Sequence, residues 1–208
     1  MSEMIIRARA VRVEFGGTAI LDGVDLAAGR GEIVAVAGEN GAGKSTLLRC
    51  LAGLQPRAGG EVGVLDRAPA DGPGFWRDVV LVGDEPAWYP GLTVLEHLEL
   101  MASVHGGSPR MGAEEALEMF GLAGRRDMAP LAMSTGQRQR LSLAMALLRP
   151  SRVLLLDEPE RGLDAAFRAR LASILAGYAA AGGTVVMATH DPGMAQAAGA
   201  RLVTLEAA

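Results

Sequence analysis

The sequence is poor in lysine and cysteine and has no long apolar run: its 208 residues include one of each, Lys44 and Cys50. A single cysteine excludes an internal disulfide and suits a reducing compartment. No apolar segment approaches the roughly 18–20 residues that cross a bilayer, and the first residues lack the basic-then-apolar order of a secretory signal. The net charge of −4, without a basic stripe, argues against a nucleic-acid-binding protein. These absences leave a soluble cytoplasmic protein with one substantial core.

Short apolar runs alternate with helical patterns along most of the chain. The segments 4–15 and 19–28 predict strands of an antiparallel edge layer. Further strands are expected at 32–38, 61–66, 78–83, 152–157, 183–190 and 200–206. Helices are expected at 43–52, twice within 93–123 with starts near Thr93 and Ser108/Pro109, at 135–148, at 164–180 and after Asp191. The alternation predicts a single α/β domain over 1–208, with a mainly parallel core from 1–83 and 150–208 and a helical lobe at about 84–149.

The only lysine lies in GENGAGKS (38–45), which matches G-x-x-x-x-G-K-[ST] between a predicted strand and a predicted helix. Glycines let consecutive N–H groups face one anion, and the helix N-terminus adds partial positive charge. The compact ammonium of Lys44 can reach between the β- and γ-phosphates, whereas the wide planar fork of arginine would not fit in the curled loop. Ser45 can place its hydroxyl on Mg²⁺. The alternative is an ordinary glycine-rich turn.

Two carboxylates follow a second apolar run, in RVLLLDEP (152–159). A buried strand with this sequence would present Asp157 and Glu158 at its carboxyl end, where ligands lie in open α/β sheets. Asp157 suits second-shell coordination of Mg²⁺, and Glu158 suits a general base that orients or deprotonates water. The alternative is a solvated acidic turn.

The segment MSTGQ (133–137) precedes the helix expected at 135–148. Ser134 and Gln137 form an S-x-x-Q capping box, which is a sufficient structural reason for both residues. A capped helix start with Gly136 is also able to bind an anion. Both interpretations stay open from this pattern alone.

GENGAGKST, MSTGQ, LLLDEP, the RGLD of 161–164 and His190 occur in the order seen in ATP-binding cassette ATPases. Over essentially its whole length the chain resembles the single-cassette ATPase subunit of a membrane transporter. The resemblance implies a P-loop NTPase fold with a mainly parallel core sheet, an N-terminal antiparallel β layer and a helical lobe. It also implies ATP and Mg²⁺ as cofactors, and ATP hydrolysis.

The resemblance gives the motifs their roles. MSTGQ looks like the signature loop, which contacts the γ-phosphate held by the other subunit of a head-to-tail dimer, whether a homodimer or a pair with a related cassette. Asp164 corresponds to the aspartate that links the two sites across that interface. His190 corresponds to the switch histidine that reads the γ-phosphate, although a lone histidine after a strand is more often structural. Phe15 lies where the family places an aromatic ring against adenine, unless it is a core residue.

The implied site residues fall into three groups. The nucleotide contacts are Phe15, Asn40, Gly41, Gly43, Lys44, Ser45, Thr46, Ser134, Gly136, Gln137 and Asp164. The Mg²⁺ ligands are Ser45, Asp157 and Asp84, and the catalytic residues are Glu158, His190 and Asp84.

Three positions depart from the family pattern. Asp84 replaces the usual glutamine that contacts Mg²⁺ before the helical lobe. Thr135 replaces the first glycine of the signature, and Arg161 replaces a small hydroxyl residue. These departures put the hydrolysis rate in doubt more than nucleotide binding.

With no membrane span of its own, the chain is expected to lie on the inner face of the cell membrane through a separate permease. The docking region would follow Asp84 and reach about Gly124, with Trp88 and Tyr89 exposed, unless Trp88 belongs to the core. The small size, without a regulatory extension, favours an exporter. The alternatives are a cassette ATPase that acts on nucleic acid or ribosomes, and a P-loop kinase of small molecules. The first class needs a long insertion or a second cassette, and this chain has neither. The second class does not need MSTGQ before LLLDEP.

Overall fold

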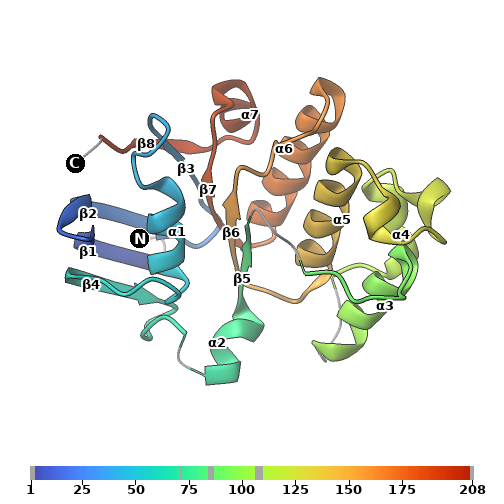
Figure 1. Cartoon of the computed structure of the whole chain (residues 1–208), viewed down its shortest axis with the longest axis horizontal. Coiled ribbons are helices and arrows are strands. Elements are labelled where there is room, and N and C mark those ends of the chain that lie inside the picture. The colour runs from blue at the N-terminus through green and yellow to red at the C-terminus, as the bar shows by residue number, and fades with distance from the viewer. Residues whose placement is uncertain (1–2, 71, 84–86, 106–109, 207–208) are drawn as a thin grey trace.

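The computed structural model describes residues 3–70, 72–83, 87–105 and 110–206. An antiparallel sheet contains β1 (Met4–Phe15), β2 (Thr18–Gly29) and β4 (Gly59–Val64) in the order β2-β1-β4. It forms one end of the molecule (Figure 1). The predicted edge layer is confirmed, and β4 joins it. The strand expected at 61–66 ends early, because Leu65 and Asp66 form a turn with φ of 56° and 57°.

The second sheet contains five strands in the order β5-β6-β7-β3-β8, and every pairing in it is parallel. The strands are β3 (Ile33–Ala37), β5 (Val79–Val82), β6 (Val153–Asp157), β7 (Thr184–Ala188) and β8 (Arg201–Thr204). Both faces of this sheet are covered, which is why β6 and β7 read as continuous apolar runs rather than as alternating ones. The predicted parallel core is confirmed.

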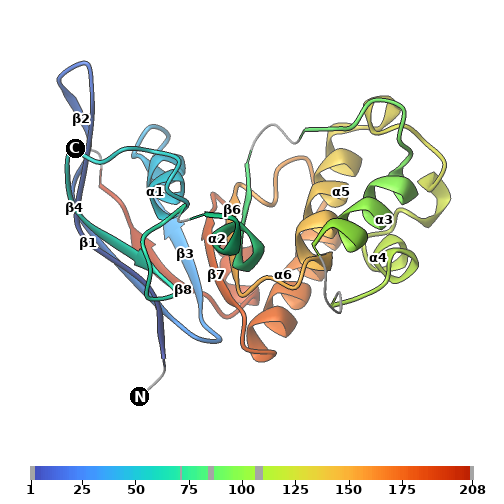
Figure 2. The same ribbon diagram turned by 90° about the horizontal axis from the view of Figure 1, so that it is seen from below.

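Alternate residues of the parallel strands enter two separate apolar clusters. Val153 and Leu155 pack with α1 (Lys44–Leu51) and the antiparallel layer, whereas Leu154 and Leu156 pack toward the helical side. All four side chains are at most 1% exposed. The antiparallel layer with α1 and the helical side therefore lie on opposite faces of the parallel sheet, as Figure 2 shows.

The helical side contains α3, α4, α5 and α6. The bounds are α3 (Val94–Val104), α4 (Ala113–Met119), η1 (Ala123–Arg125), η2 (Pro130–Ala132), α5 (Thr135–Leu148), α6 (Ala165–Ala180) and α7 (Pro192–Ala197). Thr93 and Glu96 cap α3 reciprocally, so the start predicted at Thr93 is confirmed. The start expected near Ser108/Pro109 lies outside the described residues, and α4 itself begins after Gly112.

One helix was not predicted: α2 (Gly72–Asp78), directly before β5. Its sequence, GPGFWRD, has two glycines and a proline and no helical periodicity. The helix is held by tertiary contact, since Phe75 is fully buried in the apolar cluster that α1 shares with the antiparallel layer. None of the helices in the described ranges is long and apolar enough to span a bilayer.

Two adjacent glycines at the start of β4 provide a test of how the antiparallel layer is built. At Gly60, φ is +80° and a Cβ would lie 2.3 Å from the Ala10 carbonyl oxygen, whereas a Cβ at Gly59 meets only ordinary contacts. We expect Gly60→Ala to lower the free energy of unfolding by roughly 1–3 kcal/mol. Gly59→Ala is the matched control and should change it by less than about 0.5 kcal/mol. Urea unfolding followed by circular dichroism measures both, and equal effects would contradict this packing.

Candidate active site

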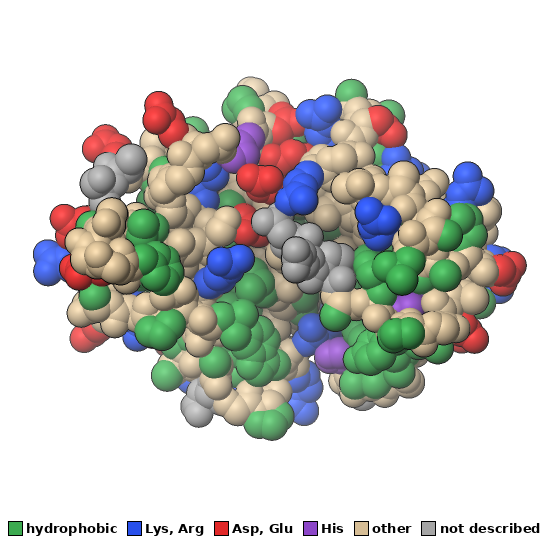
Figure 3. All heavy atoms as spheres, in the orientation of Figure 1, with side chains coloured by type: hydrophobic (Ala, Val, Ile, Leu, Met, Phe, Trp, Pro, Cys, Tyr) green, Lys and Arg blue, Asp and Glu red, His purple; other side chains and the backbone are tan. Residues whose placement is uncertain are grey.

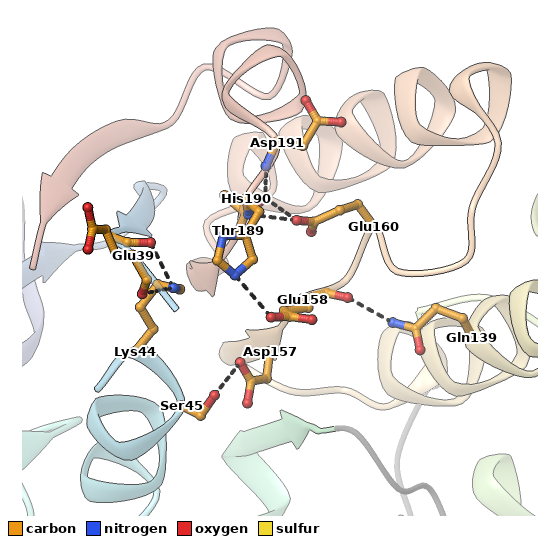
Figure 4. A network of polar contacts seen from close by, with 11 residues as sticks. Glu39, Lys44, Ser45, Gln139, Asp157, Glu158, Glu160, Thr189, His190 and Asp191 are labelled. Carbon is orange, nitrogen blue, oxygen red and sulfur yellow. Dashed lines mark hydrogen bonds and ion pairs between the residues drawn. The ribbon is translucent and has the colours of Figure 1, made fainter. Parts of the chain in front are cut away.

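The carboxyl ends of three neighbouring strands meet at one edge of the parallel sheet. Val36 of β3 and Asp157 of β6 both pair with Ala188 of β7, so the three strands end side by side. The loops that follow them carry the phosphate loop, Glu158 and His190 (Figure 4). In Figure 3, acidic side chains and a histidine gather on this face between α7 and α5. The sheet register thus brings together motifs that are more than a hundred residues apart.

The phosphate loop curls around its lysine. Gly41 and Gly43 have φ of 87° and 89°, and Gly43 is the left-handed N-cap of α1. Lys44 is 6% exposed, and its Nζ donates to the carbonyl oxygens of Gly38 and Glu39, both at 2.9 Å. The ammonium therefore lies inside the loop, where there is little room for a guanidinium. Exposed Asn40 and Gly41 and half-buried Thr46 flank it.

Ser45 and Asp157 meet directly, with Ser45 Oγ donating to Asp157 Oδ1 at 3.0 Å. Both offer hard oxygens, which is the donor chemistry that Mg²⁺ prefers. Among the residues that the structure describes, no cluster of three or more His, Cys, Asp or Glu could hold a metal alone. The pair therefore fits an ion that takes most of its ligands from nucleotide phosphates and water. Asp84, the third expected ligand, lies outside the described residues.

Glu158 is held in a strained backbone conformation at this edge. Its φ is +47°, which is uncommon for a residue with a side chain. Its N–H donates to Ala188 O at 2.9 Å, which ties the turn to β7. Its Oε1 lies 3.1 Å from Nε2 of His190, and because a carboxylate oxygen only accepts, Nε2 carries the proton in this contact. Glu158 and His190, two of the predicted catalytic residues, are thus in direct contact.

Three residues that sequence reasoning missed surround this pair. Glu160 accepts hydrogen bonds from Thr189 Oγ1 and His190 N. Gln139 of α5 donates to Pro159 O at 3.2 Å, and more weakly to Glu158 O at 3.5 Å. The only signals in the sequence were adjacency: Glu160 follows LLLDEP, and Thr189 precedes the histidine.

The signature segment forms the capping box that the sequence predicts. Ser134 Oγ accepts from Gln137 N, and Gln137 Oε1 accepts from Ser134 N. The start of α5 packs closely against the RGLD segment (161–164). A Cβ added to Gly136 would lie only 2.2 Å from Gly162 O, so this position has no room for a side chain. Thr135 is exposed beside this contact. Within the described part of the chain, no hydrogen bond or ion pair joins 134–137 to the phosphate loop.

Asp164 is the N-cap of α6. Its Oδ1 accepts from Phe167 N at 2.7 Å, and its Oδ2 accepts from Arg140 Nη2 at 2.8 Å. The Phe167 N–H, followed by the charge of Arg140, lowers the pKa of Asp164 below its ordinary value. The backbone N–H of Arg161, three residues before Asp164, donates to Glu158 O at 3.0 Å.

Two aromatic expectations resolve differently. Phe15 is 51% exposed at the end of β1, so the alternative that it is a core residue is wrong. Trp88 is half-buried against the helical cluster, and its ring meets His97 edge-on, so its core interpretation is the better one. Tyr89 is 53% exposed beside it.

Comparison with known proteins finds relatives along most of this chain. A family model described as "ABC transporter" matches residues 21–161. The chain is 41% identical to the cytochrome c biogenesis ATP-binding export protein CcmA of Mesorhizobium japonicum, over 86% of this chain and 88% of that protein. It is 38% identical to the Fe(3+) ions import ATP-binding protein FbpC of Streptomyces avermitilis, over 98% of this chain and 60% of that protein.

Two solved structures share the fold across 97% of the chain. One, described as the ATP binding subunit of an ABC transporter, has a TM-score of 0.85, 28% identity and 86% of its own length covered. The other is a dimeric ATP-binding cassette in a post-hydrolysis state bound to ADP and Pi, with a TM-score of 0.84, 27% identity and 94% covered. The P-loop cassette fold is therefore confirmed. The chain belongs to the ABC transporter family, as an ATP-binding subunit.

Proposed function

We propose that this subunit is a Mg²⁺-dependent ATPase that dimerises on ATP and drives a separate membrane permease. One observation carries the proposal: at a single sheet edge a buried Lys44, the Ser45–Asp157 pair and the Glu158–His190 pair lie on three adjacent strand ends. This combination provides a phosphate-binding cation, metal-binding oxygens and a general base.

Each group has a distinct task in the proposed reaction. Lys44 Nζ would exchange its loop carbonyls for phosphate oxygens. Ser45 and Asp157 would hold Mg²⁺, which when bound neutralises charge on the phosphates. Glu158 would orient the attacking water and accept its proton while ADP leaves. His190, in contact with Glu158 Oε1, would report the γ-phosphate to that carboxylate.

The second half of each site would come from another subunit. Ser134 is exposed, and the residues 134–137 satisfy one another rather than the phosphate loop of their own chain. An exposed, capped helix start suits an anion held by a partner. The dimeric neighbour bound to ADP and Pi supports this arrangement. Gly136, Gln137 and Asp164 would line the same interface.

We further propose that the whole chain works as one cassette, with 84–149 as the lobe that receives the permease at the inner face of the membrane. A groove of about 260 Å³ lies between the edge strand β5 and helices α3 and α5, lined by Val80, Val82, Met101 and Met145, with Arg149 among its polar lining. Exposed Tyr89 is at the start of the same lobe. A groove beside a sheet edge, with aliphatic and methionine side chains and a polar rim, suits a short amphipathic helix of a partner.

For the direction of transport we propose export, supported by the 41% identity to a protein named as an export protein. Relatives named as import proteins match at 36–39% identity, so import is the alternative that identification of the co-purifying permease would decide. The alternative of a cassette ATPase that acts on nucleic acid or ribosomes receives no support from the comparisons.

Lys44→Arg conserves charge but not shape. Because the ammonium occupies a curled loop with two carbonyls at 2.9 Å, we expect nucleotide affinity to fall by at least about 10-fold. Arg49→Lys, an exposed position on the same helix, is the matched control and should bind as the parent does. Calorimetric titration with ATP measures both, and parent-like affinity of Lys44→Arg would contradict the assignment.

Ser134→Arg places a bulky cation at the start of α5. ATP binding by the monomer should persist, because this segment does not contact its own phosphate loop, while ATP-driven dimerisation and hydrolysis should be lost. Ser173→Arg on the exposed face of α6 is the control and should dimerise normally. Gel filtration with and without ATP distinguishes the two. Normal dimerisation and turnover of Ser134→Arg would leave the segment as a helix cap only.

Glu158→Gln keeps size and reach but removes the base. We expect turnover to fall at least about 10-fold, with ATP still bound and the dimer accumulating at double mass in gel filtration. Asp84→Asn should lower the residual turnover further, because a second carboxylate can take over part of the base role. Glu115→Gln, exposed on α4, is the control. Near-parent turnover of Glu158→Gln would move the base assignment to Asp84.

A further inference from the structure

Glu160 joins the loops that follow β6 and β7. Its Oε1 accepts from Thr189 Oγ1 at 2.6 Å and from His190 N at 2.8 Å. Both donors belong to the turn between β7 and α7, whereas Glu160 lies two residues after Glu158. One carboxylate oxygen thus links the segment that carries the proposed base to the segment that carries the histidine (Figure 4).

The turn that holds His190 is fixed on both sides of the histidine. Thr189 is 4% exposed, its N–H donates to Val36 O at 3.2 Å, and its Oγ1 accepts from Asp191 N at 3.0 Å. Asp191 Oδ1 caps α7, and its Oδ2 accepts from Arg168 Nη1 at 2.9 Å. The His190 side chain extends from this fixed turn, and its Nε2 lies 3.1 Å from Glu158 Oε1.

Glu160 makes these contacts at a cost. Its second oxygen, Oε2, is buried and has no hydrogen-bond partner in the part of the chain that the structure describes. A buried carboxylate oxygen without a donor is unfavourable. The two bonds of Oε1 therefore carry the whole of the link between Glu160 and the turn that holds His190.

We propose that Glu160 is a positioning residue for hydrolysis, which acts through His190 and does not touch the nucleotide. By holding the His190 backbone, it places the imidazole against Glu158 and so fixes the orientation of the base toward water. This inference rests on the proposed function, because it assigns Glu160 a role in the same site. Misplacement of a catalytic group by about 1 Å can cost up to about 100-fold in rate.

A double-mutant cycle between Glu160→Ala and His190→Ala tests the proposal. In the parent background we expect Glu160→Ala to lower kcat by about 10-fold while KM for ATP changes by less than about 3-fold. In the His190→Ala background the same change should lower kcat by less than about 2-fold, because the imidazole through which Glu160 acts is already absent. An equal loss in both backgrounds, or no loss in the parent, would overturn the proposal. Glu99→Ala, exposed on α3, is the matched control.

Amide hydrogen exchange of the nucleotide-free protein provides a readout without catalysis. The His190 N–H, which donates to Glu160, should exchange at least about 10-fold faster in Glu160→Ala, while the Met187 N–H within β7 should not change. Unchanged exchange at His190 would also overturn the proposal.

Two conservative variants keep the proposal testable if Glu160→Ala folds poorly. Glu160→Gln retains an accepting oxygen and should recover most of the turnover, whereas Thr189→Val removes one of the two donors and should show an intermediate loss. If the turnover of Glu160→Gln were as low as that of Glu160→Ala, the hydrogen-bond role of Glu160 would be contradicted. If Glu158→Gln keeps near-parent turnover, the assignment of Glu158 as base, on which this inference rests, fails; if Glu158→Gln loses turnover as expected and the cycle is additive, only the role of Glu160 fails.

Discussion

The parallel pairing of β3, β7 and β6 is the constraint on which the rest of the structure depends. Ala188 pairs with Val36 on one side and with Asp157 on the other, so three loops begin at the same edge. A shift of one residue in β6 would turn Asp157 to the other face and remove its contact with Ser45. The two apolar clusters prevent that shift, because Leu154 and Leu155 each belong to a different face.

Two features at this edge are unfavourable for stability and are held by their surroundings. Glu158 has φ of +47°, and Glu160 Oε2 is buried without a donor among the described residues. The backbone bond from Glu158 N to Ala188 O and the contact from Gln139 of α5 hold the same turn. Since α5 begins at the signature segment, the helix that would meet a partner's nucleotide is physically joined to the turn that carries Glu158.

The sequence predicts helices and strands well where the local pattern is strong. It does not predict elements or site residues that are held by contacts between residues far apart in the chain. The Ser134–Gln137 box and the apolar run 152–157 predict α5 and β6 closely, because each signal is local. The helix α2 has no such signal, and the buried ring of Phe75 holds it. Lys44, Asp157, Glu158 and His190 are predictable from motifs, whereas Glu160 and Gln139 contact the site across 19 to 30 positions that no local pattern relates.

The central claim is that this edge is half of a nucleotide site that another copy completes. Mixing the Glu158→Gln and Ser134→Arg proteins in equal amounts with ATP tests it most directly. In a mixed head-to-tail pair, one site combines both defects and the other has a native Glu158 with a native Ser134. The account predicts an ATPase rate for the mixture well above the mean of the two variants measured alone at the same total concentration. A rate equal to that mean would contradict it.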